Sequence, residues 1–516
     1  MLEDIHALLD NAAPIDPNDA RYRKLLSDVQ CNILSPHRKR RAHYLFLRFV
    51  DGADARELPA KYLLGVLACN AFERARVLAA VCGGVNLLPE RYCAAVRPAG
   101  RNPGACVTPA QRTLLADVGI TSELAAKRFN GARGDGFAIN CLLTRHGCRK
   151  LQVELPDAAF IQGQAARWQR LNDPEPTTGG QSPSWDAPYD DADAVLIVAY
   201  DPGSGDAGEH QKLVLNALRA LISGHSTVIV EEEGYSLRRS RDDRPIEAFG
   251  FRDGISQPQF FIESNVVPSQ ARSWNDFAPL RTVLTPDPYG QTPHACGSYF
   301  VFRKLRQHVF DFHGQVQSLA RTLNRPAADV LAELVGRHPN GEPLASTSSD
   351  TLNDFDFSDD QSATRCPGYA HIRKVNPRRD VKPIYGAEQR RIVRRGLSYG
   401  PELARDDEGL PTLDPAHLGD AVGMLFLCAQ ANIAEQFEHL QAHWANNQQI
   451  PRSLMPGPDA IVGRTAPGES LRIAARDEHG LIKHIDYRSF VEMRGGTYLF
   501  APSISFLKSQ LNDVWM

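Results

Sequence analysis

The segment Ala194-Val-Leu-Ile-Val-Ala-Tyr200 is followed by an amphipathic pattern over 213–222 and by the segment Ser226-Thr-Val-Ile-Val-Glu231. The first segment is a continuous apolar run with the length of a buried strand, and the last is rich in β-branched residues, which favour strands. The pattern between them predicts a helix. A strand, a helix and a strand in a chain with few long helical patterns favour an α+β fold, in which helices pack on a sheet face.

The same alternation continues in both directions along the chain. Further strands are predicted at 42–50, 137–143, 297–305, 423–428 and 496–503, and helices at 1–28, 328–335 and 433–444. No sequence repeat relates the two halves, but the second half shows the same order of elements as the first. We therefore expect two units of the same class.

Length and charge narrow the classes of function. A chain of 516 residues is long enough for two or three domains with substantial cores. Its net charge of -3 gives no overall attraction to nucleic acid or to anionic membranes. The basic run Arg38–Arg41 is interpreted as a solvated turn rather than a nucleic-acid patch, because it is short and leads directly into a predicted strand.

Targeting signals and metal motifs are not apparent. No apolar run approaches the roughly 18 residues of a membrane span, and the first residues are acidic where a signal peptide is basic, so a cytoplasmic location is expected. The ten cysteines form no C-x-x-C pair, so a structural zinc site is not supported. We interpret them as mostly buried reduced thiols.

One histidine stands between two breaks in regular structure. His371 follows the turn-forming pair Pro367-Gly368 and precedes Pro377. A neutral imidazole can bind a metal while its other nitrogen is oriented by a second group. The following cations, Arg373, Lys374 and Arg378, would suit the carboxylates of a bulky anionic cofactor. A packed or surface histidine is the alternative interpretation of the same pattern.

Two further segments support the interpretation of His371 as a metal ligand. In Gly250-Phe-Arg-Asp-Gly254, two glycines bracket Asp253 and predict a tight turn that points its carboxylate in a fixed direction. An Asx-type turn that only satisfies backbone donors is the alternative. The arginine-rich run 390–400 places cations beside a glycine turn, although such runs are usually solvated surfaces.

Together these segments resemble the dye-decolourising peroxidase family of haem enzymes. The G-x-x-D-G hallmark is matched at 250–254, and the A-H-I-R-x-x-N-P-R segment of the proximal histidine at 370–378. The turn that opens on the distal arginine is matched at 394–400, and the closing R-G-G-x-Y-x-F-x-P-S pattern at 494–503. The order agrees from about residue 30 onward. The early Q-G-N pattern is Gln30-Cys31-Asn32 in this chain, and the cysteine-bearing stretch of about 65–135 is unmatched.

The resemblance implies a pair of ferredoxin-like domains with antiparallel sheets and peripheral helices. The first domain, residues 1–290, would carry the G-x-x-D-G motif, and the second, residues 291–516, would hold most of the haem. The implied cofactor is one haem b per chain.

The resemblance also implies a role for each candidate residue. His371 would be the axial iron ligand, and Gly254 and Arg373 would contact the cofactor, the latter through a propionate. Asp459, with Glu435 as the alternative, would accept a hydrogen bond from the far N–H of His371 and so increase its electron donation to iron. Asp253 would transfer a proton between the peroxide oxygens, and Arg394, or else Arg395, would stabilise developing negative charge.

The expected function is that of a haem peroxidase. The resemblance implies reduction of hydrogen peroxide and oxidation of dyes, phenols or other bulky organic donors through a ferryl intermediate. Because large donors would not enter a buried pocket, surface aromatic residues could pass electrons inward. The candidates are the tyrosines and the tryptophans Trp168, Trp185, Trp274, Trp444 and Trp515. The alternatives are a haem-binding or iron-handling protein with little turnover, and a protein without haem whose motifs are structural turns. Neither nucleic acid nor a membrane is an expected partner, and the oligomeric state is not predicted.

Overall fold

The structure is a computed structural model. It describes residues 4–49 and 138–507, apart from residue 12 and the stretches 177–184, 203–214, 217–218, 220–221, 223–225, 263–273, 347–351, 381–387, 408, 413–420, 452–454 and 466–470. The unmatched stretch of about 65–135 lies outside the described residues, as does most of the helix predicted at 213–222.

The first unit is an antiparallel sheet of four strands: β1 (Arg41–Phe49), β2 (Ala138–Leu143), β3 (Ala194–Tyr200) and β4 (Ser226–Tyr235). They lie side by side in the order β2-β3-β1-β4. Every residue of β2 and β3 is buried. Burial on both faces explains why these two segments are continuously apolar rather than alternating.

The second unit repeats this arrangement with β8 (Cys296–Gln307), β10 (Leu397–Tyr399), β11 (Gly423–Gln430) and β14 (Val491–Ala501). Their spatial order is β14-β8-β11-β10, all antiparallel. Counted along the chain, the strands of both units lie in the order fourth, first, third, second, or its reverse, which is that of ferredoxin-like folds. The predicted α+β class with two ferredoxin-like units is confirmed, whereas the division of the chain at residue 290 stays a prediction.

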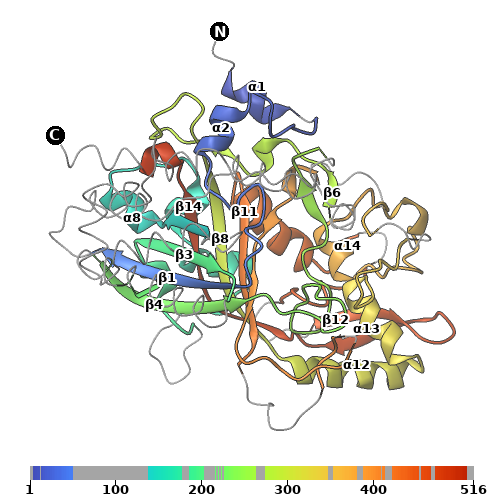
Figure 1. The fold of residues 1–516 in the computed structure, drawn as a ribbon. Helices are drawn as coiled ribbons and strands as arrows, with labels where there is room; N and C mark the ends of the chain where they lie inside the picture. The colour runs from blue at the N-terminus through green and yellow to red at the C-terminus, as the bar shows by residue number, and fades with distance from the viewer. Residues whose placement is uncertain are drawn as a thin grey trace, which may run out of the picture.

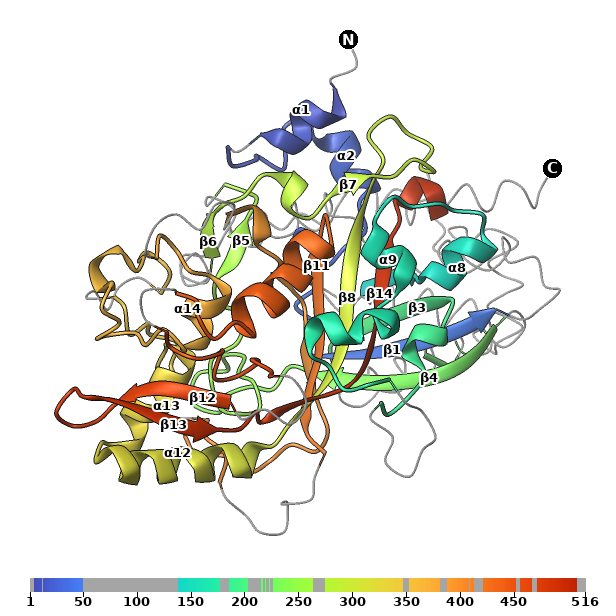
Figure 2. The ribbon, with the colours of Figure 1, turned by 180° about the vertical axis from the view of Figure 1, so that it is seen from behind.

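The two sheets meet at both edges and share one core (Figure 2). Phe500 of β14 pairs with Leu143 of β2, and Ser398 of β10 pairs with Tyr235 of β4. The shared core is aromatic; for example, the ring centroids of Phe46 and Phe302, one from each sheet, lie 5.0 Å apart. Because the inner faces are packed against each other, a large cavity has to form elsewhere in the molecule.

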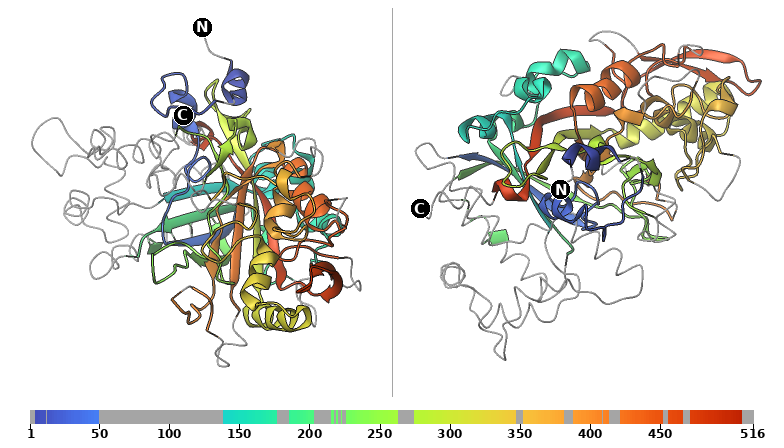
Figure 3. Two further views of the ribbon diagram at one scale, coloured as in Figure 1. Left: turned by 90° about the vertical axis from the view of Figure 1, so that its right-hand side faces the viewer. Right: turned by 90° about the horizontal axis from the view of Figure 1, so that it is seen from above.

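Short helices surround the sheets (Figure 1). They are α1 (Ile5–Asp10), α2 (Arg23–Asp28), α8 (Arg145–Lys150), α9 (Ala158–Gln162), α12 (Val309–Leu323), α13 (Ala327–Val335) and α14 (His371–Val375), with the π-helical η9 (Ala434–Glu438) and η10 (Leu440–Ala445) and the 3₁₀ segments η2 (Ala165–Leu171), η3 (Tyr189–Asp191), η5 (Leu280–Thr282), η6 (Ser358–Asp360) and η7 (Glu388–Arg390). Figure 3 shows that the helices between residues 300 and 450 (yellow and orange) lie on one side of the strands. The remaining strands are short: β5 (Gln257–Gln259), β6 (Trp274–Phe277), β7 (Thr285–Pro286), β9 (Val393–Arg394), β12 (Leu471–Arg476) and β13 (Ile482–Tyr487).

The predicted strands are confirmed to within a few residues, and the helices less fully. The predicted helix 1–28 is two short helices, and the one at 433–444 is π-helical. The longest described helix, α12, was not predicted, although its buried residues Val309, Phe312, Val316, Leu319 and Leu323 recur at helical spacing. Six cysteines fall in the described part of the chain, and all are buried free thiols. Among the described helices, none is long and apolar enough to cross a membrane.

Candidate active site

A cavity of about 920 Å³ opens on the outer face of the second sheet. Its wall takes residues from β8, β11, α14 and η10, and from the loop 245–258 that follows β4. The candidate residues Asp253, Gly254, His371 and Arg394 all line this cavity. Three segments that are far apart in the sequence are therefore brought together around one space.

On one wall, a buried carboxylate orients the histidine. His371 Nδ1 lies 2.9 Å from Oδ2 of Asp459, whose side chain has no exposed surface. Because an ionised carboxylate can only accept, we assign the proton to Nδ1, which leaves the lone pair on Nε2. Oδ1 of Asp459 accepts from the backbone N–H groups of Ile461 and Val462, at 2.7 and 2.9 Å. The alternative Glu435 is instead exposed and paired with Arg390.

The tight turn predicted around Asp253 is present. Gly250 and Gly254 have φ of +102° and +75°, a region that favours glycine. A Cβ on Gly250 would also lie 3.1 Å from the carbonyl oxygen of Gly409, so the loop approaches its neighbour too closely for a side chain. The Asp253 N–H donates to the Pro245 carbonyl at 2.9 Å, and its Oδ1 accepts from the Gly254 N–H at 2.6 Å. The half-buried carboxylate is thus aligned by local bonds while it faces the cavity.

The residue that holds this loop was not predicted from the sequence. Glu247 also lines the cavity, and its two carboxylate oxygens accept from the N–H groups of Phe249 and Phe251 at 3.0 and 2.9 Å. Gln307 of β8 donates to the same carboxylate at 2.6 Å. Burial raises the pKa of Glu247. An acid three residues before Gly250 was the available signal, but nothing local distinguishes it from a surface acid.

The neighbouring residues Arg394 and Arg395 have different hydrogen-bond partners. The guanidinium of Arg394 donates to the carbonyl of Ile255, two residues beyond Asp253. The Arg394 backbone N–H donates to Oε1 of Gln257 at 3.1 Å, which ties β9 to the loop. Arg395 also lines the cavity, but its guanidinium donates to the carbonyls of Asn32 and Ile33, each at 2.8 Å. Of the two candidates, Arg394 is the one whose guanidinium bonds to the loop that carries Asp253.

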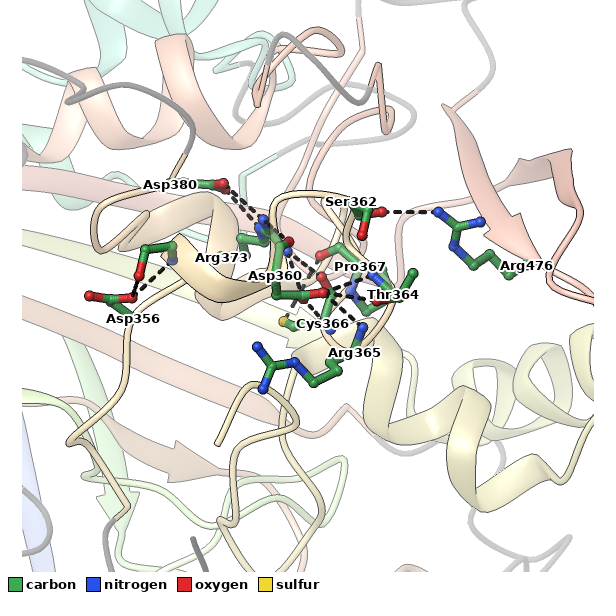
Figure 4. A network of polar contacts seen from close by, with 11 residues as sticks. Asp356, Asp360, Ser362, Thr364, Arg365, Cys366, Pro367, Arg373, Asp380 and Arg476 are labelled. Atoms are coloured by element: carbon green, nitrogen blue, oxygen red, sulfur yellow. Dashed lines mark hydrogen bonds and ion pairs between the residues drawn. The ribbon is translucent and has the colours of Figure 1, made fainter. Parts of the chain in front are cut away.

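Arg373, which was predicted to contact the cofactor, lies in the network of polar contacts of Figure 4 and is not among the residues that line the cavity. Arg373 is fully buried, does not line the cavity, and bonds both oxygens of Asp380 at 2.7 and 2.8 Å and Asp360 at 3.1 Å. Successive residues of an α-helix are about 100° apart, so a side chain two positions after His371 points to the opposite face of α14. Its pairing with two carboxylates gives it a structural role.

Other arginines supply the positive charge on the cavity wall. Arg378 donates to Ser256 Oγ at 3.0 Å and stacks on Phe355, with its guanidinium carbon 4.1 Å from the ring centroid. Arg337 bonds to carbonyl groups and to the side chain of Asn353 rather than to a carboxylate. Burial, together with the positive charges of Arg378 and Arg394, lowers the pKa of Arg337 to about 9. These clustered cations repel one another, and a bound anion would relieve the repulsion.

The wall fits a haem. Within the described ranges, no group of three or more His, Cys, Asp or Glu residues could hold a metal ion directly. His371 offers one oriented imidazole to the haem iron, and Arg337 and Arg378 match the two carboxylates of a propionate-bearing macrocycle. A volume of about 920 Å³ is at the upper end of ordinary cofactor sites.

The predicted electron-relay tryptophans are only partly described. Trp185 and Trp444 are buried, with exposed fractions of 3% and 2%, and Trp168 is half-buried. The side chain of Trp274 and all of Trp515 lie outside the described residues. Neither buried tryptophan presents a surface to a bulky donor, so a role in electron transfer stays a prediction for Trp168, Trp274 and Trp515.

The chain resembles known peroxidases over almost its whole length. No protein-family model matches it. It is 32% identical over 507 residues to the multifunctional dye peroxidase DyP2 of Amycolatopsis sp., covering 94% of this chain and 96% of that protein. It is 28% identical over 411 residues to the dye-decolorizing peroxidase msp1 of Mycetinis scorodonius, covering 73% and 76% of the two chains. Among solved structures, the DyP-type peroxidase of Anabaena sp. has a TM-score of 0.71 at 28% identity, covering 98% of this chain and 99% of that one. The structure of Amycolatopsis DyP2 has the same TM-score at 29% identity, covering 96% and 99%.

Proposed function

The chain belongs to the dye-decolourising peroxidase family, and on that premise we propose a role for each wall of the cavity. It is a haem-dependent peroxidase, an oxidoreductase that uses hydrogen peroxide to oxidise dyes and phenols. These relatives are all peroxidases, and none supports the alternative of a haem-binding protein with little turnover.

The wall of α14 holds the cofactor. We assign one haem b per chain to the cavity, with Nε2 of His371 as the iron ligand and Asp459 as the acceptor of its Nδ1–H. The charge of Asp459 increases electron donation by the imidazole and keeps the ring in one orientation. When bound, the haem supplies the redox chemistry, taking up the two oxidising equivalents of hydrogen peroxide and passing them to the donor. A pyridine haemochromogen spectrum checks the stoichiometry and the type of haem.

The wall that carries Asp253 moves a proton. The Asp253 carboxylate accepts a proton from one oxygen of hydrogen peroxide and returns it to the other oxygen, which leaves as water when the O–O bond breaks. Arg394, a permanent cation that lines the same cavity and bonds to the loop carrying Asp253, stabilises the negative charge that develops on the leaving oxygen. Gly254 contributes a left-handed backbone and an N–H that aligns the carboxylate, rather than a side chain.

One observation carries this assignment: the acid, the cation and the oriented imidazole come from distant segments and face one cavity. Replacing either Asp253 by Asn or Arg394 by Leu should slow the reaction with peroxide by about a hundredfold or more, while the haem remains bound. Stopped-flow absorbance of the Soret band measures both quantities. The matched controls are Asp359→Asn and Arg321→Leu, which change exposed residues of the same types away from the cavity. Wild-type rates in both site variants would overturn the assignment.

A further inference from the structure

We propose that Arg373 is a positioning residue for the wall that binds the cofactor. Through two buried carboxylates it fixes the segment 360–380, so that His371 and Arg378 face the cavity. The inference rests on the proposed function and deepens it, since it concerns how the same site is held. It begins with a residue that was predicted to contact the cofactor and that is buried outside the cavity wall.

Arg373 uses all five of its N–H groups as donors within this segment (Figure 4). Its Nε and Nη2 bond to the two carboxylate oxygens of Asp380, at 2.7 and 2.8 Å. Nη2 also donates to the Asp360 carbonyl at 2.9 Å, and Nη1 donates to the Asp360 carboxylate at 3.1 Å and to the Cys366 carbonyl at 2.6 Å. The guanidinium carbon lies 4.7 Å from the ring centroid of Phe357. A lysine carries its three donors on one nitrogen and cannot reproduce this fork.

Asp360 extends the network to the turn before α14. Its Oδ1 accepts from the N–H groups of Thr364 and Arg365, at 2.9 and 3.1 Å, and its Oδ2 accepts from the N–H of Cys366 at 2.9 Å. These bonds close the turn that leads into the helix. Because the same carboxylate also bonds to Arg373, the turn and the helix are fixed to each other.

The network sets the direction in which α14 presents His371. The helix has five residues, and a helix this short is not stable without tertiary contacts. Successive residues are about 100° apart, so Arg373 lies about 200° from His371 around the helix. The bond to Asp459 orients the imidazole ring, whereas the Arg373 network orients the helix that carries it. Fixing the far face of so short a helix therefore fixes the imidazole on the near face.

The same guanidinium holds a strained turn that carries Arg378. Arg378 and Arg379 have φ of +21° and +57°, in the left-handed region that is unfavourable for residues other than glycine. Asp380 follows directly; its N–H donates to the Pro377 carbonyl at 2.6 Å, and its carboxylate is bonded to Arg373. A strained backbone persists only where its surroundings hold it. The pair therefore keeps Arg378 on the cavity wall.

The network itself stands outside the cavity wall. Arg373, Asp360 and Asp380 are all buried, and none of them lines the cavity. A change in the network leaves the imidazole and the wall cations in place in the sequence and alters only how they are held. Removing one partner of a buried ion pair leaves the other charge uncompensated, so a single change should loosen the whole segment.

The first test replaces Arg373 in the haem-loaded full chain. Arg373→Lys keeps the charge but loses the fork, so we expect His371 to be held in more than one orientation. EPR of the ferric protein should then show a mixture of species in place of one, and haem should transfer to apomyoglobin about tenfold faster or more. The matched control is Arg476→Lys, because Arg476 donates to the Ser362 carbonyl of the same segment at 2.9 Å without joining the network (Figure 4). The control should keep the wild-type EPR spectrum and haem retention.

The second test asks whether Arg373 and Asp380 act together. Asp380→Asn keeps the shape of the side chain and removes its charge, and we expect the same EPR mixture and about tenfold faster haem transfer. If Arg373→Lys does not fold, this milder variant carries both readouts alone. The double variant Arg373→Lys/Asp380→Asn should lie within about twofold of the more affected single variant, since two partners of one network share a single effect.

Wild-type EPR spectra and haem retention in both single variants would overturn the inference while the peroxidase assignment stands. Fully additive effects in the double variant would also overturn it, as would a control variant that loses haem as fast as Arg373→Lys. A wild-type chain that binds no haem would remove the proposed function and this inference with it.

Discussion

The wall that carries His371 and the wall that carries Asp253 hold their functional side chains by different means. The His371 wall depends on one bond to a fully buried carboxylate, whose other oxygen is occupied by two backbone N–H groups. The Asp253 wall depends on a glycine-bracketed turn, held from behind by Glu247 and from the side by Arg394. A buried charge that accepts three hydrogen bonds is hard to move, whereas a half-buried turn can adjust as substrate enters. A rigid wall suits His371, which would stay bound to the cofactor, and an adjustable wall suits Asp253, which would accept and return a proton in each reaction cycle.

The largest expected effect comes from removing the ligand itself. His371→Ala leaves no imidazole on the α14 wall, so we expect at least a tenfold loss of bound haem after expression with a haem precursor. Absorption at the Soret band and EPR of the ferric protein measure occupancy and ligation. His479→Ala, an exposed histidine on the β12–β13 hairpin, is the control. Wild-type haem content with an unchanged EPR spectrum would contradict the assignment of the ligand.

The next effect is expected from the carboxylate behind the histidine. Asp459→Asn keeps the shape of the side chain but removes its charge, so the imidazole donates less to iron. We expect a 10- to 100-fold slower reaction with peroxide and a higher ferric reduction potential, since the ferric state loses its nearby anion. Potentiometric titration measures the second quantity, which a purely structural role would not shift. Asp486→Asn, in an exposed ion pair, is the control.

A smaller effect is expected at the support of the Asp253 wall. Glu247→Gln replaces one acceptor oxygen by an amide donor, so one backbone N–H of the loop loses its partner, at a cost of about 1–3 kcal/mol. We expect the reaction with peroxide to slow by about tenfold while the EPR signature of His371 stays unchanged. The exposed Glu342→Gln is the control. Loss of haem from this variant would contradict the assignment, because it would show that Glu247 also supports the wall that binds the cofactor.

The smallest effect is a pH dependence of stability on the His371 wall. Lys374 is buried, and its ammonium donates to the Asn447 carbonyl at 2.7 Å. Burial lowers its pKa from an ordinary value near 10.5 to about 7. The unfolded state therefore binds more protons between these values, so the free energy of unfolding rises with pH across that window, by at most about 1.4 kcal/mol per unit.

Urea unfolding at pH values of about 7.5 and about 9.5 measures this slope. Lys374→Met should remove much of it, whereas Lys24→Met, at an exposed lysine, should retain it. Equal slopes in the wild type and Lys374→Met would show that this ammonium is not buried in the folded protein.

Sequence patterns singled out residues that line the cavity where local constraint was strong. Asp253 lies between two glycines that need a left-handed backbone, and His371 lies between two breaks, so both were visible without coordinates. The sequence did not show which arginine lines the cavity. Arg373 and Arg378 are both close to His371 in sequence, but one lies on the far face of a helix and the other follows Pro377, which ends that helix. The direction of each side chain depends on which face of the helix packs against the rest of the protein, and the sequence pattern does not give this.

The sequence by itself determined the α+β class and the motifs, because apolar runs, glycines and prolines act through local backbone preferences. Only the tertiary structure decided that the two sheets meet at both edges, that Glu247 supports the Asp253 loop, and that Arg38 and Lys39, from a basic run near the N-terminus, line the cavity. These are contacts between residues that are distant along the chain. Their free energy depends on burial and on charge in three dimensions, and a one-dimensional pattern carries neither quantity.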